Sequence, residues 1–97
     1  MKYDIDKRVE EDIIKIAKKH SIEKVILFGS RARGDNFERS DIDLAVSGGN
    51  FLDFYYDIEE NTWTLLSFDI VDLDKGISKE LQTEIDRDGV VIYEKIW

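Results

Sequence analysis

Apolar residues recur along this chain with two periods, one typical of helices and the other typical of strands. Between residues 6 and 19 they recur at helical spacing, Asp6 is placed to cap the helix start, and lysines crowd the last turn. The apolar residues of this segment are Val9, Ile13, Ile16 and Ala17. The segment 41–46 instead alternates acidic or small residues with apolar ones, which is the period-two pattern of a strand.

The remaining segments complete an alternating order of helices and strands. A wholly apolar run at 25–28 stops at Gly29 and predicts a buried strand, and Gly34 closes a helical turn over 30–34. The other predicted elements are helices at 51–60 and 77–87 and strands at 63–73 and 90–93. This order predicts an α/β (α+β) fold in which helices cover a sheet, and the length fits a single domain over residues 1–97.

The helix predicted at 51–60 is rich in aromatic residues, and we expect only part of them to be buried. The residues expected on its inward face are Phe51, Leu52, Tyr55 and Ile58. Phe54 and Tyr56 fall outside that face, so they form a candidate patch for a protein partner.

Composition narrows the class of protein. Hydrophobic residues make up 42% of the chain and charged residues 37%, which is the balance of a globular protein in water. No apolar run reaches the roughly 20 residues that span a bilayer, and the first residues, MKYDIDKR, lack the apolar stretch of a signal peptide. A cytoplasmic location is therefore expected. The chain has no cysteine, which excludes disulfides and thiolate metal sites. Its one histidine, His20, lies at a helix end, where a capping or surface role is expected rather than a catalytic one.

Net charge limits the kind of partner. The formal charge is −8, and the basic residues are scattered except for a small group at Arg31, Arg33 and Arg39. An acidic chain of this kind repels a nucleic-acid backbone, so general nucleic-acid binding is not expected. Divalent cations, a basic protein partner, or a phosphate held by the arginine group are consistent with the charge.

Asp41 and Asp43 are the first candidate site residues. Two positions apart on a strand, their side chains leave the same face, roughly 6.6 Å apart along the chain. Neighbouring carboxylates repel each other unless a cation lies between them, and Mg²⁺ takes one or two carboxylates together with phosphate oxygens and water. The spacing alone is weak evidence, because three more Asp-x-Asp pairs occur, at 4/6, 72/74 and 86/88.

Gly29 and Ser30 distinguish the 41/43 pair from the others. They follow a predicted buried strand, where glycine allows a phosphate to approach the backbone and the Ser30 hydroxyl can donate to it. Taken alone, Gly-Ser also fits a simple turn that ends a strand. Together with Asp41 and Asp43, the two features complement each other, one for a phosphate tail and one for its metal.

The string GSRARGDNFERSDIDLAV, residues 29–46, resembles the signature of the DNA polymerase beta-like nucleotidyltransferase superfamily. It most resembles the minimal nucleotidyltransferases, the MNT proteins, and the order of helices and strands agrees over nearly the whole chain. The resemblance implies a nucleotidyltransferase fold with a small mixed β-sheet covered by helices. It also implies that Asp41 and Asp43 bind Mg²⁺, as two ions, and that Gly29 and Ser30 hold the β- and γ-phosphates.

The resemblance further implies a third carboxylate within an apolar–Asp–apolar segment, which Asp69 fits, as a metal ligand or as the base for the attacking hydroxyl. A residue on the exposed face of a strand is the alternative reading of Asp69. Asp72 is the fallback ligand, although on a regular strand it points to the opposite face. Arg31 and Arg33 either neutralise phosphate charge or grip a partner, or are solvated helix residues.

The reaction implied is in-line attack on the α-phosphate of a nucleoside triphosphate, with ATP the expected substrate and pyrophosphate released. No segment of the chain reads as an acceptor site. MNT proteins are commonly paired with a helical HEPN-domain protein, as antitoxin and toxin, which implies a hetero-oligomer and a partner tyrosine as AMP acceptor. The alternative is a non-catalytic binding module that neutralises a HEPN partner by complex formation.

Overall fold

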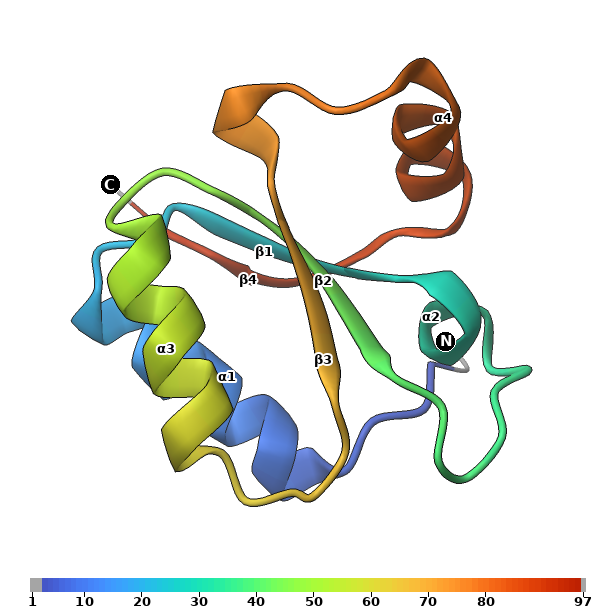
Figure 1. Ribbon diagram of the computed structural model, residues 1–97, viewed down its shortest axis with the longest axis horizontal. Helices are drawn as coiled ribbons and strands as arrows, with labels where there is room; N and C mark the ends of the chain where they lie inside the picture. The colour runs from blue at the N-terminus through green and yellow to red at the C-terminus, as the bar shows by residue number, and fades with distance from the viewer. Residues whose placement is uncertain (1–2, 97) are drawn as a thin grey trace.

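The computed structural model describes residues 3–96 and shows the predicted alternation of helices and strands (Figure 1). In chain order the elements are α1 (Lys7–Lys19), β1 (Lys24–Phe28), α2 (Gly29–Arg33), β2 (Ile42–Ser47), α3 (Phe51–Asn61), β3 (Phe68–Asp72), the 3-10 turn η1 (Leu73–Lys75), α4 (Lys79–Asp88) and β4 (Val90–Glu94). Asp6 caps α1, as predicted, by accepting a hydrogen bond from the backbone N–H of Arg8. No helix within residues 3–96 combines the length and the apolar character needed to cross a bilayer.

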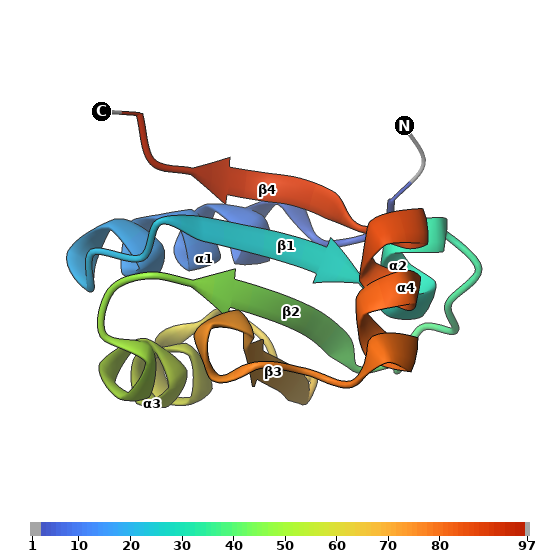
Figure 2. The same cartoon turned by 90° about the horizontal axis from the view of Figure 1, so that it is seen from above.

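The four strands form one mixed sheet in the order β3-β2-β1-β4. Strand β1 is antiparallel to both β2 and β4, whereas β2 and β3 are parallel and are connected through α3. Helices α1 and α3 lie together on one side of the sheet, and α4 lies on the other (Figures 1 and 2). The predicted fold class, a small mixed sheet covered by helices, is confirmed.

The sheet face under α1 and α3, which we call the closed face, carries the main core. Alternate strand residues such as Leu27 and Leu44 point to it and are fully buried against Ile13 of α1 and Phe54 and Ile58 of α3. Two expectations for α3 were therefore wrong. Phe54 is a core residue rather than part of a partner patch, and Leu52, expected inward, is 59% exposed. Phe54 and Ile58 are four residues apart, so the buried stripe of α3 runs through them.

The opposite face of the sheet, which we call the open face, is only partly covered. Phe28, Ala45 and Ile85 of α4 are its buried residues, with half-buried neighbours such as Leu81 packed around them. The acidic residues Asp43 and Asp69 lie on this face, because each alternates with residues that point to the closed face.

The third strand is shorter than predicted. Its expected range was 63–73, but β3 covers only Phe68–Asp72, and residues 62–67 form a loop in which Leu65 is fully exposed. A strand needs a neighbour for its backbone hydrogen bonds. Within residues 3–96, β3 pairs with β2 alone. The first paired residue of β2, Ile42, lies opposite Phe68, so the ladder offers no strand partner for the residues before Phe68.

Candidate active site

Gly29 lies directly against the carboxylate of Asp43. It follows β1 with a φ of 75°, a left-handed conformation that glycine adopts without strain, and it is buried. A Cβ atom at this position would overlap Oδ2 of Asp43. Glycine is therefore required here both for the turn into α2 and for the close approach of the backbone to that carboxylate.

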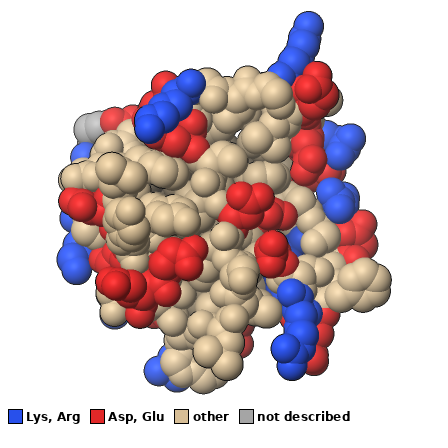
Figure 3. Space-filling view, viewed as in Figure 1, with Lys and Arg blue, Asp and Glu red and all other residues tan. Residues whose placement is uncertain are grey.

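Strand pairing brings Asp69 beside Asp43. The two residues are register partners in the parallel β2–β3 ladder, and Phe28, the last residue of β1, is the partner of Asp43 on its other side. Side chains of register partners leave the same face of adjacent strands, which lie roughly 4.8 Å apart. Asp41 precedes β2 and is exposed, as is Asp69. Acidic side chains stand near the middle of the face in Figure 3, over β2 and β3.

Crowding of these carboxylates changes the acidity of Asp43. The pKa of Asp43 is raised from its ordinary 3.8 to about 6, first by burial and then by the negative charges of Asp69, Asp41 and Glu84, in that order. The positive charge of Arg33 opposes these effects on the same pKa. The repulsion between carboxylates that the sequence predicts is therefore present, and it contributes to the raised pKa of Asp43.

The donor set suits a hard cation, but it is not a closed cage. All the groups around Asp43 that raise its pKa are carboxylates, and a cation beside them would relieve the repulsion. Within residues 3–96, however, no group of three Asp, Glu or His side chains is arranged to hold a metal ion. Mg²⁺ usually takes one or two protein carboxylates and completes its shell with phosphate oxygens and water, so an open arrangement fits Mg²⁺ that arrives with a nucleotide.

Arg31 does not face this site, which corrects the expectation that it binds phosphate and the alternative that it is solvated. Its side chain is buried, with 5% of the residue exposed. The guanidinium donates from Nε to the Ser40 carbonyl (3.0 Å), from Nη2 to the Glu38 carbonyl (2.9 Å) and from Nη1 to the Asp4 carbonyl (3.2 Å). A planar guanidinium can satisfy several carbonyls at once, so Arg31 fixes the loop that leads into Asp41.

Arg33 remains near the site. Its Nε donates to Asp35 (3.0 Å) and its Nη1 to Asp88 of α4 (3.3 Å), and its charge is one that acts on the pKa of Asp43. Glu84, also on α4, was not among the predicted residues. It lies outside every motif in the sequence, and only the packing of α4 over the open face brings its charge near Asp43.

Other acidic and polar candidates have local structural roles. Asp72 caps η1 by accepting from the backbone N–H of Asp74, so the fallback ligand is occupied away from the Asp43 cluster. His20 is the C-cap of α1, where a capping role was predicted, and its Nε2 lies 2.8 Å from Oδ2 of Asp57 on α3.

Comparison with known proteins identifies the family of the chain. The model of the polymerase beta nucleotidyltransferase family matches residues 11–96. A protein of Methanocaldococcus jannaschii named "Putative protein adenylyltransferase" is 41% identical over an alignment of 68 residues, and the match covers 68% of this chain and 66% of that protein. The match thus spans slightly less than two thirds of that relative's length.

Solved structures share the fold. One described as "Structure of putative minimal nucleotidyltransferase" superposes with a TM-score of 0.64 at 29% identity, covering 84% of this chain and 86% of that chain. A chain of the toxin–antitoxin MntA-HepT superposes with a TM-score of 0.66 at 20% identity, covering 93% of this chain and 74% of that one, a likeness of fold. With the family model matching 86 of its 97 residues, from 11 to 96, this chain belongs to the polymerase beta nucleotidyltransferase family.

Proposed function

We propose that this chain is a Mg²⁺-dependent nucleotidyltransferase that moves AMP from ATP to a hydroxyl group of a partner protein. The observation that carries the proposal is the environment of Asp43, which has Gly29 packed on its carboxylate and Asp69 beside it in the sheet. The raised pKa of Asp43, caused first by burial and then by the charges of Asp69 and Asp41, supports the proposal. Such an arrangement lowers stability, so a function at this point is favoured over a structural role.

Each residue of the site has a proposed task. Asp41 and Asp43 would hold the Mg²⁺, which would neutralise charge on the phosphates. Gly29 and Ser30 would hold the β- and γ-phosphates, with the Ser30 hydroxyl donating to their oxygens. Asp69 would accept the proton of the acceptor hydroxyl. The hydroxyl oxygen then bonds to the α-phosphorus while the bond between the α-phosphorus and pyrophosphate breaks.

The proposed partner is a HEPN-domain toxin, and the proposed acceptor is one of its tyrosine hydroxyls, which would make this chain the antitoxin of a hetero-oligomer. Support comes from the resemblance of residues 29–46 to the MNT signature and from the shared fold with a chain of MntA-HepT. The name of the M. jannaschii relative, a protein adenylyltransferase, agrees with AMP transfer to a protein. A binding module without catalysis is less consistent, because it would have no use for the repelling carboxylates.

Label transfer tests the proposal. The chain would be mixed with the HEPN protein encoded beside it, Mg²⁺ and ATP labelled in the α-phosphate. Label should appear on the partner and be lost with Asp41→Asn or Asp43→Asn. Asp86→Asn is the matched control, since Asp86 belongs to an Asp-x-Asp pair but lies exposed on α4, where it accepts from Gln82. Tight binding without any transfer would leave the non-catalytic module as the explanation.

A further inference from the structure

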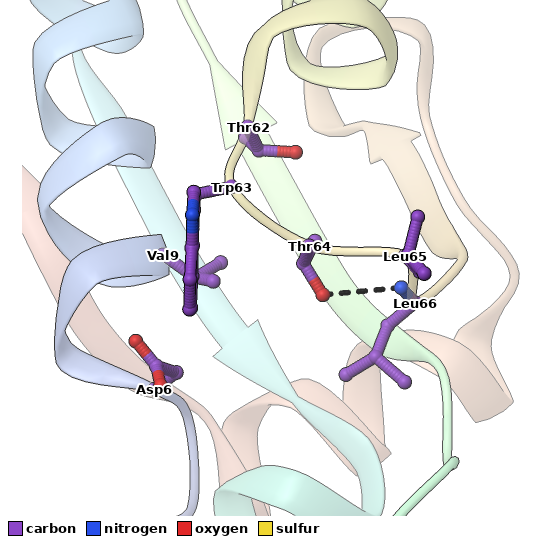
Figure 4. Close-up of a pocket in the computed structure, with 7 residues that line it drawn as sticks. All are labelled: Asp6, Val9, Thr62, Trp63, Thr64, Leu65 and Leu66. Atoms are coloured by element: carbon purple, nitrogen blue, oxygen red, sulfur yellow. Dashed lines mark hydrogen bonds between the residues drawn. The ribbon is translucent and has the colours of Figure 1, made fainter.

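A groove leads from the start of α1 to the candidate active site. Its largest part is a hollow of about 650 Å³ between the first turn of α1, at Asp6 and Val9, and the loop 62–66 (Figure 4). Two further hollows share lining residues with it and with each other. Leu66 lines all three, and the last one reaches Asp41. The groove thus ends at Asp41, one of the two carboxylates proposed to hold the metal.

The largest hollow of this groove has a mainly apolar wall, and polar contacts hold its loop in place. Trp63 is 55% exposed, and its ring lies under the Arg8 guanidinium at 4.6 Å, while its backbone N–H donates to Asp12 of α1 (2.8 Å). Leu65 and Leu66 leave the loop in opposite directions in Figure 4, and Leu65 is fully exposed. A braced loop that presents a leucine to water is unfavourable in isolation and is typical of a surface that another molecule covers.

The charges along the groove favour a basic occupant. Its acidic lining residues are Asp4, Asp6, Glu38 and Asp41, and Arg39 is the exposed base among them. The other arginine of the lining is the buried Arg31, whose three side-chain nitrogens each donate to a carbonyl group of the chain. Apolar walls with an acidic rim complement a protein segment that combines apolar and basic side chains, and they repel a nucleic acid.

We propose that this groove binds the acceptor segment of the partner protein, a stretch of apolar and basic residues that carries the hydroxyl group to be modified. The role of the occupant as acceptor rests on the proposed function. One end of the groove is Asp41, two residues before Asp43 in the chain, so an occupant lying along Leu65 and Leu66 brings its end to the proposed reacting groups.

Panning of the purified chain against a displayed library of random peptides tests the binding step without nucleotide or metal. Selected peptides should combine Leu, Ile, Phe or Trp with Lys or Arg, and their binding should alter the fluorescence of Trp63. Leu65→Ser should weaken their affinity by about tenfold, as expected for loss of a central apolar contact. Because Leu65 is fully exposed, this substitution does not disturb the core.

Leu52→Ser is the matched control, since Leu52 is an exposed leucine on α3 outside the groove lining, and it should leave peptide affinity within about twofold. Failure to select peptides, selection of acidic ones, or equal binding by Leu65→Ser would overturn the proposal. So would light scattering that shows self-association through Leu65. Transfer of label from ATP is measured separately, so a failure of the proposed enzyme activity remains distinguishable from a failure of the groove.

Discussion

The two faces of the sheet differ in how well their polar groups are paired and in how much apolar surface they bury. On the closed face, fully buried side chains such as Leu27 and Leu44 pack against α1 and α3. The carboxylate of Asp57 on α3 is hydrogen-bonded to the ring of His20. On the open face only a few residues are buried, and Asp43 lies half-buried among carboxylates that repel it. Stability thus comes mainly from one face, while the other carries groups that oppose it.

In this small domain, the residues that stabilise the fold and the residues of the candidate site therefore lie mainly on opposite faces of the sheet. A sheet with both faces sealed would leave no place for a nucleotide, and α4 covers only part of the open face (Figure 1). The uncovered part is where Asp41, Asp43 and Asp69 end up. Substitutions on the two faces should therefore have opposite signatures.

Asp43→Asn should show the largest effect. Nucleotide transfer should fall by about 10³-fold, because loss of a metal-binding carboxylate removes several kcal/mol of charge stabilisation. Stability should rise at the same time, since the charge that burial and Asp69 disfavour is gone. Label transfer and urea unfolding at pH 7.5 measure the two quantities. If the variant is both inactive and less stable, the conclusion that Asp43 opposes folding while serving the activity is wrong.

Truncating one leucine on each face should show which face holds the fold. Leu44→Ala removes a fully buried side chain from the closed face and should cost about 2–5 kcal/mol of unfolding free energy. Leu81→Ala, the same change at a half-buried position over the open face, should cost about half as much or less. Chemical denaturation of both variants gives the comparison, and equal losses would contradict it.

Arg31→Lys should test whether the buried arginine acts through the fold or through phosphate. Lysine keeps the charge but cannot reach all three carbonyls, so stability should fall by about 1–3 kcal/mol. The exposed Arg33→Lys should cost clearly less, because its ion pairs with Asp35 and Asp88 are screened by water. Unfolding curves decide the matter. A rise in KM for ATP with unchanged stability would restore Arg31 to the phosphate site.

The pH dependence of stability should carry the signature of Asp43. Its pKa is raised from 3.8 in the unfolded chain to about 6, so its favourable contribution is fully present below pH 3.8 and is lost as the pH rises through 6. The stability gained by Asp43→Asn should accordingly be small near pH 4 and larger above pH 6. Urea unfolding of both proteins across this range measures it, and a gain independent of pH would count against the raised pKa.

The smallest effect is expected on the closed side, at His20. The hydrogen bond from His20 lowers the pKa of Asp57, more than any other contact does, so this carboxylate stabilises the fold above its unfolded pKa and loses that effect as the pH falls through its lowered folded pKa. His20→Ala should cost about 0.5–1.5 kcal/mol at pH 7 and less in acid. Thermal unfolding at the two pH values gives the sign, which should be opposite to that of Asp43.

Much of the fold could be predicted from the sequence, because its signals are local. Helical spacing at Val9 and Ile13, alternation around Ile42 and Leu44, and glycine at position 29 each depend on a few neighbouring residues, and the elements they predict are present. The inward face of α3 was predicted wrongly at Leu52 and Phe54. Helical periodicity alone does not fix which of two adjacent apolar stripes meets the sheet.

The sequence by itself determined the order of the elements and the signature that places Gly29, Ser30, Asp41 and Asp43 in one segment. Only the tertiary structure decided that Asp69 is the register partner of Asp43, that Glu84 contributes to its charge environment, and that Arg31 is buried. These outcomes depend on strands and helices that are distant along the chain. The parallel pairing of β2 with β3 and the packing of α4 arise from burial shared across the whole domain, which no local pattern contains.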